Sequence, residues 1–337
     1  MLHKPQSKLF SMKLHKYIGF SLAAFVVLTL ASCLKDKPNN ASPDGGSNNV
    51  VEFQNISVPK SYTSPFPEYD NGVPIDPVAD TGSFGIIINY TGAQEVAPVD
   101  ITVNIALSQA ALDSFNNNVG SNFEIAPSDV FAFPATATIK KGTRQVIIRP
   151  IITSAADYDY TKTYALPLTI TSSSYGVVSS NYGTAIFQFI AENKYDGAYA
   201  FTQETVGWGA YSIADGPPSY TWPNNVNMQT VAQYSDVTYD GGVGEKFLQL
   251  AFSPSGAATA FGATTPQFTF DPATDALITV VNTTPNDGRD RQLALNPAVT
   301  DSRYDASTKT IYAAYIMTQT GRPPQYIYDT LVYQGPR

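Results

Sequence analysis

The chain has 337 residues, and its 28 Asp and Glu outnumber its 20 Lys and Arg, which gives a formal net charge of −8. No window after Lys37 is basic enough to neutralise a phosphate backbone, so we expect no nucleic-acid partner. The single cysteine excludes an intrachain disulfide, and both histidines, His3 and His15, stand near the N-terminus.

Residues 1–32 have the pattern of a bacterial lipoprotein signal peptide. Lysines come first, and an apolar run then extends from Tyr17 to Leu30, which is too short for a comfortable membrane span. The run closes with Leu30-Ala31-Ser32-Cys33, which resembles a lipobox. That resemblance implies cleavage before Cys33 and acylation of Cys33, which would anchor the chain to the outer membrane. The alternatives are an ordinary cleaved signal and an uncleaved anchor helix.

Cleavage at this position would leave a mature chain without histidine. Such a chain has no Ser-His-Asp or Cys-His machinery and no histidine-ligated metal, and acylation of Cys33 removes the free thiol. We therefore expect no catalytic residue, no cofactor and no metal. Residues 33–50 consist mostly of turn formers and polar residues, so we predict that they form a flexible tether.

Residues 51–192 alternate between short strand-like runs and turn residues. The apolar–polar alternation of Val99–Leu107 predicts a half-buried strand, and Ser108 is a good N-cap for a short helix that Asn116–Asn118 would end. Pro167 predicts that its strand lies at a sheet edge or carries a bulge. About seven strands in this length are typical of an immunoglobulin-like β-sandwich. The expected strands include 84–90, 99–107, 135–139, 145–152, 164–171 and 183–190.

A polar joint at Asn193–Gly197 predicts that a second domain spans residues 193–337. Turn residues followed by alternation over Tyr304–Tyr315 predict a hairpin. Helical periodicity is nearly absent from both halves, which places the chain in the all-β class. The other strands expected in this half are 198–206, 246–252, 267–271, 276–282, 310–317 and 326–333.

Four segments of the first half together resemble the N-terminal β-sandwich module of Bacteroidetes surface lipoproteins. They are residues 98–107, 112–116, the turn 139–142 and the strand Tyr164–Ile170, whose Tyr-x-x-Pro-Leu-x-Ile pattern is the most specific piece. Members of this family occur in polysaccharide-utilisation systems, some fused to glycosidase or lectin-like domains. The resemblance implies an exposed outer-membrane lipoprotein associated with glycans, with an import complex as partner. It supplies no catalytic motif.

Two segments of the second half, Phe268–Asp271 and Tyr333–Arg337, resemble the C-terminal companion domain of the same lipoproteins. This looser resemblance implies a meandering antiparallel β-barrel or sandwich of lipocalin-like form over residues 193–337.

The only two tryptophans, Trp208 and Trp222, flank a loop together with Tyr211 and Tyr220. Sugar rings present C–H faces that stack on aromatic side chains, so these four residues are the candidate glycan-binding site. Tryptophans in β domains also pack in cores and at rims, which is the alternative interpretation.

We therefore expect a non-catalytic lipoprotein that binds an oligosaccharide or polysaccharide at the cell surface. One alternative is an adhesive or structural, fimbria-like surface lipoprotein, which would carry a strand that can be donated to a neighbour. A second alternative is a histidine-free glycoside hydrolase, because two carboxylates suffice for that chemistry. Asp236, Asp240 and Glu245 come closest to a carboxylate run, but their spacing does not match the family-18 glycosidase pattern, and we expect no enzymatic activity.

Overall fold

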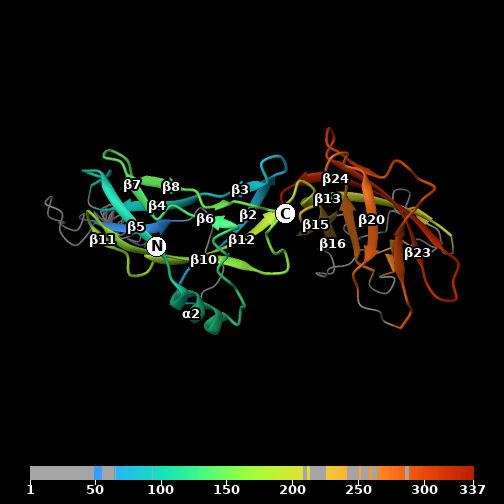
Figure 1. Cartoon of the computed structure of the whole chain (residues 1–337), viewed down its shortest axis with the longest axis horizontal. Coiled ribbons are helices and arrows are strands. Elements are labelled where there is room, and N and C mark those ends of the chain that lie inside the picture. The colour runs from blue at the N-terminus through green and yellow to red at the C-terminus, as the bar shows by residue number, and fades with distance from the viewer. Residues whose placement is uncertain are drawn as a thin grey trace, which may run out of the picture.

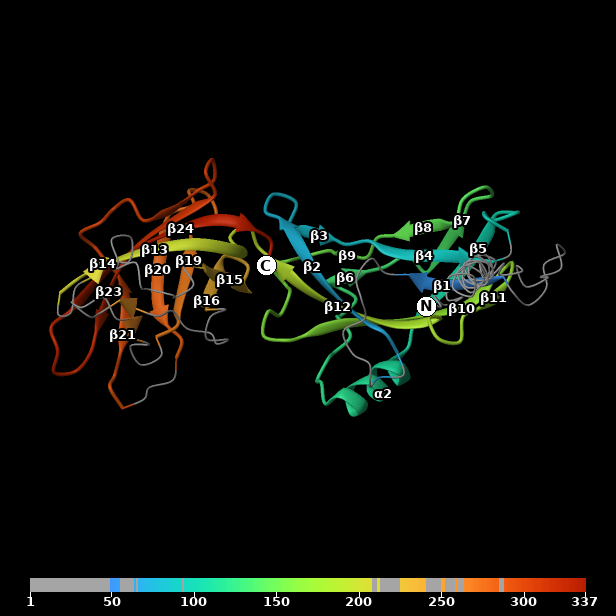
Figure 2. The same ribbon diagram turned by 180° about the vertical axis from the view of Figure 1, so that it is seen from behind.

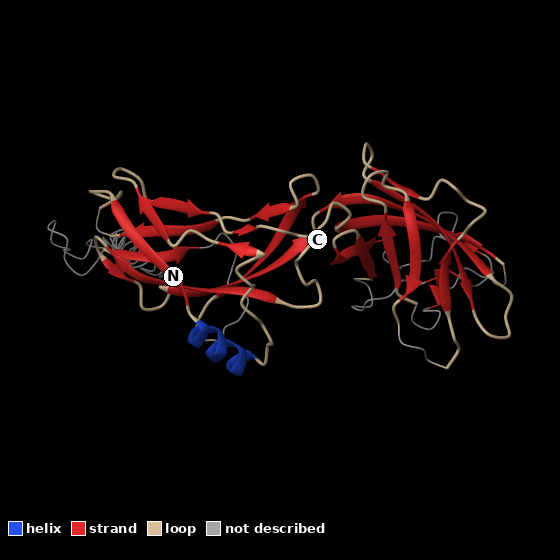
Figure 3. Ribbon diagram, viewed as in Figure 1, coloured by secondary structure: helices blue, strands red, loops and turns tan. Residues whose placement is uncertain are grey.

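Figure 1 shows the computed structural model of the chain, and Figure 2 shows the same structure from behind. Strands dominate the residues that it describes, and one helix is present among them (Figure 3), so the expected all-β class is confirmed. Residues 1–48, with the predicted signal peptide and Cys33, lie outside the described part. The structure describes residues 49–54, 64, 66–92, 94–207, 211–212, 225–240, 250–251, 258–259, 264–284 and 288–337.

The first half of the chain forms a sandwich of two β-sheets. Strand β2 pairs in parallel with β12, so the segment after residue 68 meets a segment more than a hundred residues later. The smaller sheet has the order β11 (Val177–Val178), β1 (Val50–Gln54), β4 (Ile86–Thr91), β8 (Gln145–Ile148). The larger sheet has the order β6 (Phe131–Ala132), β9 (Ile151–Ile152), β3 (Thr81–Ser83), β2 (Glu68–Asp76), β12 (Thr184–Glu192), β10 (Tyr164–Ser173), β5 (Ile101–Leu107), β7 (Thr136–Ile139).

The apolar faces of the two sheets make the core of the sandwich. Phe53 of β1 meets Phe187 of β12 edge to face, with ring centroids 5.5 Å apart. Along β5, buried and exposed residues alternate from Ile101 onward, as the sequence pattern predicts for a strand with one face in the core. The predicted immunoglobulin-like sandwich is therefore confirmed.

The helix α2 (Gln109–Val119) begins as predicted, because the backbone N–H of Ala111 donates to Ser108 Oγ at 3.2 Å. Its predicted end at Asn116–Asn118 is wrong. The helix continues to Val119 and ends at Gly120, whose φ of 73° lies in the left-handed region that glycine tolerates. The Asn116 side chain instead accepts from the backbone N–H of Phe123 at 3.2 Å, so it orders the chain after the helix.

Of the two alternatives expected for the Pro167 strand, the edge position is wrong, because β10 lies inside the sheet between β12 and β5. The strand does carry an irregularity, since its register with β5 shifts between Ile170 and Ser172. The pairing of β10 with β5 begins at Leu168, where it meets Leu107, and β5 ends at that residue. The Pro167 carbonyl accepts from the backbone N–H of Ser108 at 2.8 Å, just before the helix. Proline has no backbone N–H to donate to a neighbouring strand. Because β5 has already ended beside Pro167, no such donor is needed there, and the sheet tolerates the proline.

The last two residues of the expected tether, residues 49 and 50, lie in the sandwich. Asn49 is buried, and its Oδ1 accepts from the Tyr90 hydroxyl at 2.8 Å. Val50 then begins β1. A buried amide with a partner belongs to an ordered structure, so residues 49–50 are part of the sandwich.

The second half forms a barrel-like antiparallel sheet, so the expected lipocalin-like form is confirmed. Its main strands pair antiparallel with their neighbours in chain order, and the first, β13 (Gly197–Val206), also pairs with the last, β24 (Gln325–Gly335). Among the described residues, the one gap in the backbone pairing lies between β20 (Leu277–Asn282) and β21 (Gln292–Leu295). Across that gap Asn282 Nδ2 donates to the Arg291 carbonyl at 3.1 Å. The main strands are β13 (Gly197–Val206), β15 (Asn225–Ala232), β16 (Ser235–Tyr239), β19 (Pro266–Phe270), β20 (Leu277–Asn282), β21 (Gln292–Leu295), β23 (Thr310–Thr318) and β24 (Gln325–Gly335).

Short strands complete this half. β14 (Tyr211–Ser212) pairs with β13, and β22 (Arg303–Asp305) pairs with β23, which is the predicted hairpin. A separate pair is formed by β17 (Leu250–Ala251) and β18 (Ala258–Thr259). The expected strand 246–252 otherwise falls outside the described residues.

Each half has its own hydrophobic cluster. The buried cluster of the sandwich ends at Ala191, and that of the barrel begins at Tyr195, which stacks on Phe270 with ring centroids 4.0 Å apart. The two bodies lie end to end with the C-terminus between them (Figure 2), and Gln233 Nε2 of the barrel donates to Asp80 Oδ1 of the sandwich at 2.6 Å. The division into independent domains at residue 193 stays a prediction.

Candidate functional site: the cleft between sandwich and barrel

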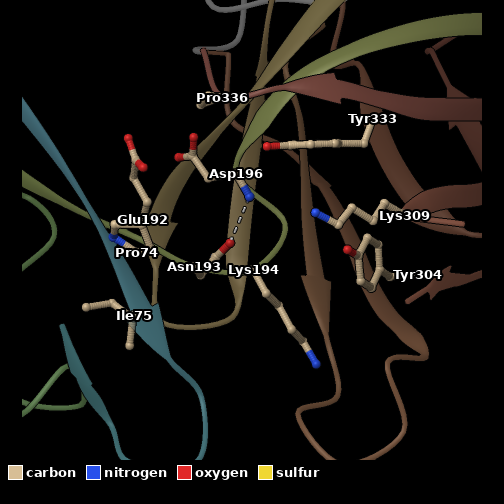
Figure 4. Close-up of a pocket in the computed structure, with 10 residues that line it drawn as sticks. All are labelled: Pro74, Ile75, Glu192, Asn193, Lys194, Asp196, Tyr304, Lys309, Tyr333 and Pro336. Atoms are coloured by element: carbon tan, nitrogen blue, oxygen red, sulfur yellow. Dashed lines mark hydrogen bonds between the residues drawn. The ribbon is translucent and has the colours of Figure 1, made fainter. Parts of the chain in front are cut away.

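A cavity of about 330 Å³ lies where the sandwich meets the barrel (Figure 4). We call it the junction cleft. Pro74 and Ile75 of β2 line it from the sandwich. Glu192, Asn193, Lys194 and Asp196 line it from the connecting segment. Its other lining residues belong to the barrel and are Tyr304, Lys309, Tyr333 and Pro336.

The connecting segment is held to the barrel by Asn193. Its Oδ1 accepts from the backbone N–H groups of Tyr195 at 2.9 Å and Asp196 at 3.2 Å, the second of which is drawn in Figure 4. Its Nδ2 donates to Asp236 Oδ2 at 2.7 Å. Asp236 is fully buried, and burial raises the pKa of its carboxyl well above the usual range. An Asn side chain that bonds the backbone two residues on fixes a turn, so this segment enters the barrel in one orientation.

Two carboxylates line the cleft, and they differ in the hydrogen bonds that they accept. Asp196 accepts from the backbone N–H of Thr230 at 2.8 Å, from its hydroxyl at 2.9 Å and from Arg337 Nε at 2.7 Å. Among the described residues, the Glu192 carboxylate makes no hydrogen bond, and its ion-pair contact is with Arg337 at 4.0 Å. Burial raises the pKa of Glu192, and the nearby charge of Asp196 raises it further, while Arg337 lowers it. Both oxygens of Asp196 are therefore used in hydrogen bonds within the protein, whereas the Glu192 carboxylate can accept a hydrogen bond from a ligand.

The barrel contributes three polar groups that have no hydrogen-bond or ion-pair partner among the described residues. They are the ammonium of Lys309 and the hydroxyls of Tyr304 and Tyr333. Lys309 Nζ lies 4.7 Å from the centroid of the Tyr333 ring, and Figure 4 shows both side chains pointing from the barrel toward the sandwich. Lys309 covers one face of the Tyr333 ring, and the ring also meets Tyr199 edge to face, with ring centroids 5.6 Å apart. The cleft thus presents hydrogen-bonding groups rather than an open ring for stacking.

A second lysine, Lys194, is already paired. It makes an ion pair with Asp275, and its Nζ lies 5.3 Å from the centroid of the Tyr195 ring. Lys309 is therefore the cation that the cleft offers to a ligand.

Of the predicted aromatic site, the structure describes Tyr211 alone. Tyr211 lies in β14, where its backbone pairs with Thr205. Trp208, Tyr220 and Trp222 lie outside the described residues, so the aromatic cluster stays a prediction. Sequence reasoning missed Glu192, Tyr304, Lys309 and Tyr333, because they come from distant segments that share no motif.

Two members of the carboxylate run that came closest to a glycosidase motif are buried. Asp236 is buried and bonded to Asn193, Asp240 is buried within the barrel, and Glu245 lies outside the described residues. In the part of the chain that the structure describes, no group of three or more His, Cys, Asp or Glu could hold a metal ion. Across the same residues, no helix has the length and apolar character needed to cross a membrane.

Comparison with known proteins supports the same architecture. Residues 53–176 match a family model described as an N-terminal domain. A Bacteroides ovatus protein of unknown function has a similar structure, with a TM-score of 0.54 and 14% identity over 86% of this chain and 95% of that chain. No curated protein matches the sequence.

Two further solved structures are similar at lower scores. One is another Bacteroides ovatus protein of unknown function, with a TM-score of 0.47 and 16% identity over 84% of this chain and 94% of that one. The other is an auxiliary nutrient binding protein from Bacteroides thetaiotaomicron, with a TM-score of 0.45 and 17% identity over 82% of this chain and 94% of that one. The family-model match over residues 53–176 and the Bacteroides ovatus structure with a TM-score of 0.54 together confirm the resemblance to Bacteroidetes proteins at the level of the fold.

Proposed function

We propose that this chain is a lipid-anchored outer-membrane protein that binds an oligosaccharide in the junction cleft without transforming it. The observation that carries the proposal is the set of cleft groups without a partner among the described residues, Lys309 Nζ and the hydroxyls of Tyr304 and Tyr333. Each sugar hydroxyl can donate and accept, so such groups pair readily with a sugar. Ligand sites also favour junctions between compact bodies and volumes of roughly 300–1,000 Å³.

The state of the two carboxylates supports a binding role over hydrolysis. A glycosidase needs an acid and, beside it, a second carboxylate that is free to act as nucleophile or base. Asp196 accepts three hydrogen bonds from Thr230 and Arg337, so it has little capacity left for such a role. Glu192 alone remains available, as an acceptor for a sugar hydroxyl.

The fimbria-like alternative receives no support from the strand arrangement. β1 lies between β11 and β4, and β24 lies between β13 and β23. Strand donation requires an open groove or a strand that can leave its sheet, and both of these strands are paired on two sides. The lipid anchor on Cys33 and an import complex as partner remain parts of the proposal that rest on the sequence.

The proposal is tested with the protein shortened to begin after Cys33, on a glycan array and in polysaccharide affinity gels. Lys309→Met and Tyr333→Phe each remove one polar group, and we expect each to weaken binding about tenfold, the worth of one hydrogen bond. Lys140→Met, at an exposed lysine of the sandwich, and Tyr312→Phe, on the barrel surface, are the matched controls. Unchanged binding by both cleft variants would place the site elsewhere, and release of reducing sugar would contradict the non-catalytic role.

The aromatic segment is tested separately. If the polysaccharide binds at the aromatic segment instead of the cleft, Trp208→Ala and Trp222→Ala should abolish retardation in the affinity gels, while the melting temperature falls by no more than a few degrees. If both variants unfold, the two tryptophans are core residues and the stacking role is wrong.

A further inference from the structure

The barrel wall of the junction cleft presents hydrogen-bond donors. The Lys309 ammonium has three donors and no acceptor, and the hydroxyls of Tyr304 and Tyr333 can donate as well. None of the three has a hydrogen-bond or ion-pair partner within the part of the chain that the structure describes. Tyr304 is 7% exposed and packs in the barrel core, so its ring holds the hydroxyl at the cavity in a fixed position. A largely buried polar group that lines a cavity without a partner indicates a ligand that supplies one.

The Tyr304 hydroxyl keeps its proton and can therefore act as a donor. Burial raises the pKa of this hydroxyl, and the negative charge of Asp275 raises it further. A protonated phenol donates one hydrogen bond, and its preferred partner is an oxygen with high negative charge.

Lys309 adopts a backbone conformation that is unfavourable for lysine. It stands in the turn between β22 and β23 with a φ of 50°, in the left-handed region where glycine and asparagine are the usual residues. Its carbonyl accepts from the backbone N–H of Tyr333 at 3.1 Å, and its Nζ lies over the ring of the same tyrosine. The turn and the ammonium are thus both held against β24. A strained residue beside a cavity indicates that its side chain has a function there.

The other charges at the cleft do not compensate that of Lys309. Lys194 and Arg337 each have a carboxylate partner of their own. The Glu192 carboxylate lies against β2 of the sandwich, because a Cβ at Gly72 would overlap it. Burial raises the pKa of Glu192, which favours its neutral form. The cleft therefore has a positively charged donor wall on the barrel and an acceptor on the sandwich side.

We infer that the oligosaccharide of the junction cleft is acidic, and that its carboxylate or sulfate binds the donor cluster of Lys309, Tyr304 and Tyr333. The inference rests on the proposed function and adds the class of ligand to it. An anionic group offers several oxygens to the donors, and hydrogen bonds from an ammonium to an anion are about twice as strong as neutral ones. A neutral hydroxyl would leave the ammonium without a counter-charge. Glu192 accepts from hydroxyls on the other side of the same sugar.

The test uses matched pairs of ligands in titration calorimetry with the protein that begins after Cys33. Oligomers of galacturonate and of mannuronate are compared with their methyl esters, and κ-carrageenan oligomers are compared with their desulfated forms. At least one anionic oligomer should bind about tenfold more tightly than its neutral counterpart, and its affinity should fall as the salt concentration rises. The pair that responds identifies the group as carboxylate or sulfate.

Variants of Lys309 separate charge from hydrogen bonding. Lys309→Gln keeps a donor without the charge, so it should remove the preference for the anionic oligomer, whereas Lys309→Arg should retain it. Lys140→Gln, at an exposed lysine of the sandwich, is the matched control and should change nothing. Lys309→Asn should weaken binding and raise the melting temperature by about a degree or more, because asparagine tolerates the left-handed conformation. A lysine kept for stability would give a lower melting temperature, which would contradict the inference.

The inference and the proposed function fail in different ways. Binding of neutral oligomers as tight as that of anionic ones, still weakened by Tyr333→Phe, would overturn the acidic ligand and leave the cleft as a binding site. Binding that no cleft variant changes, or no binding by any oligomer, neutral or anionic, would overturn both.

Discussion

Arg337 Nε lies 2.7 Å from Asp196 Oδ1, which joins two residues 141 positions apart at the border of the junction cleft. The Arg337 side chain is about one-fifth exposed and the Asp196 side chain is almost fully buried. The same guanidinium lies 4.0 Å from Glu192, so one cation lies between the two carboxylates of the cleft.

Replacement of Arg337 by Met should therefore destabilise the protein. The buried Asp196 would lose its cation, and we expect the free energy of unfolding to fall by about 1–3 kcal/mol, the usual cost of removing one partner from a largely buried charged hydrogen bond. Arg303→Met is the control, because Arg303 pairs with Asp301 at a more exposed position, where such pairs contribute little. Urea unfolding measures both. Equal effects of the two changes would show that the Arg337–Asp196 contact is not stabilising.

The buried carboxyl of Asp329 predicts that the protein becomes less stable as pH rises. Burial raises its pKa from 3.8 to about 7, although Tyr315 and Gln203 donate to it. Between these two values the folded protein holds a proton that the unfolded chain releases, so the free energy of unfolding falls as pH rises from about 4 to about 7 and levels off above. Asp236 has a pKa shifted in the same direction and adds to the slope.

Asp329→Asn should flatten this dependence, because the amide does not titrate. The measurement is the free energy of unfolding at pH 5 and pH 8 for the parent and the variant. Asp100→Asn is the control, since backbone and side-chain hydrogen bonds lower the pKa of Asp100 and its titration lies below this window. An unchanged slope for Asp329→Asn would mean that Asp329 is not the group that titrates.

The separate hydrophobic clusters predict that fragments 49–192 and 193–337 each fold alone. The barrel fragment keeps the contacts of Asn193 with Asp236 and loses the Gln233–Asp80 hydrogen bond. Each fragment should melt cooperatively in calorimetry, close to the temperature of its transition in the whole chain. If neither fragment melts cooperatively while the whole does, residue 193 is not a domain boundary.

The Leu30–Cys33 motif predicts that Cys33→Ser yields an unprocessed precursor without lipid. Mass spectrometry of the N-terminal peptide from the membrane fraction measures both the start of the mature chain and its acyl chains. An unaltered protein that starts elsewhere, or that starts at Cys33 without acyl groups, would contradict the lipoprotein assignment and the outer-membrane location with it.

Local patterns were sufficient for many of the elements. Ser108 predicts the start of the helix because its hydroxyl accepts from a backbone N–H three residues on, and the alternation of 101–107 predicts a strand because successive side chains of a strand face opposite sides. The hairpin at Tyr304–Tyr315 follows for the same reason. The strands β2, β15, β16 and β21 were not predicted, because they contain many polar residues and lack a strong apolar run.

The sequence by itself determined the all-β class, most strand positions and the motif that ends at Cys33, because each of these depends on residues close together in the chain. Tertiary structure alone decided that β2 pairs with β12, that Pro167 lies inside a sheet and that Glu192, Tyr304, Lys309 and Tyr333 share one cleft. Contacts between distant residues depend on which sheets pack together, and no spacing in the chain encodes that packing.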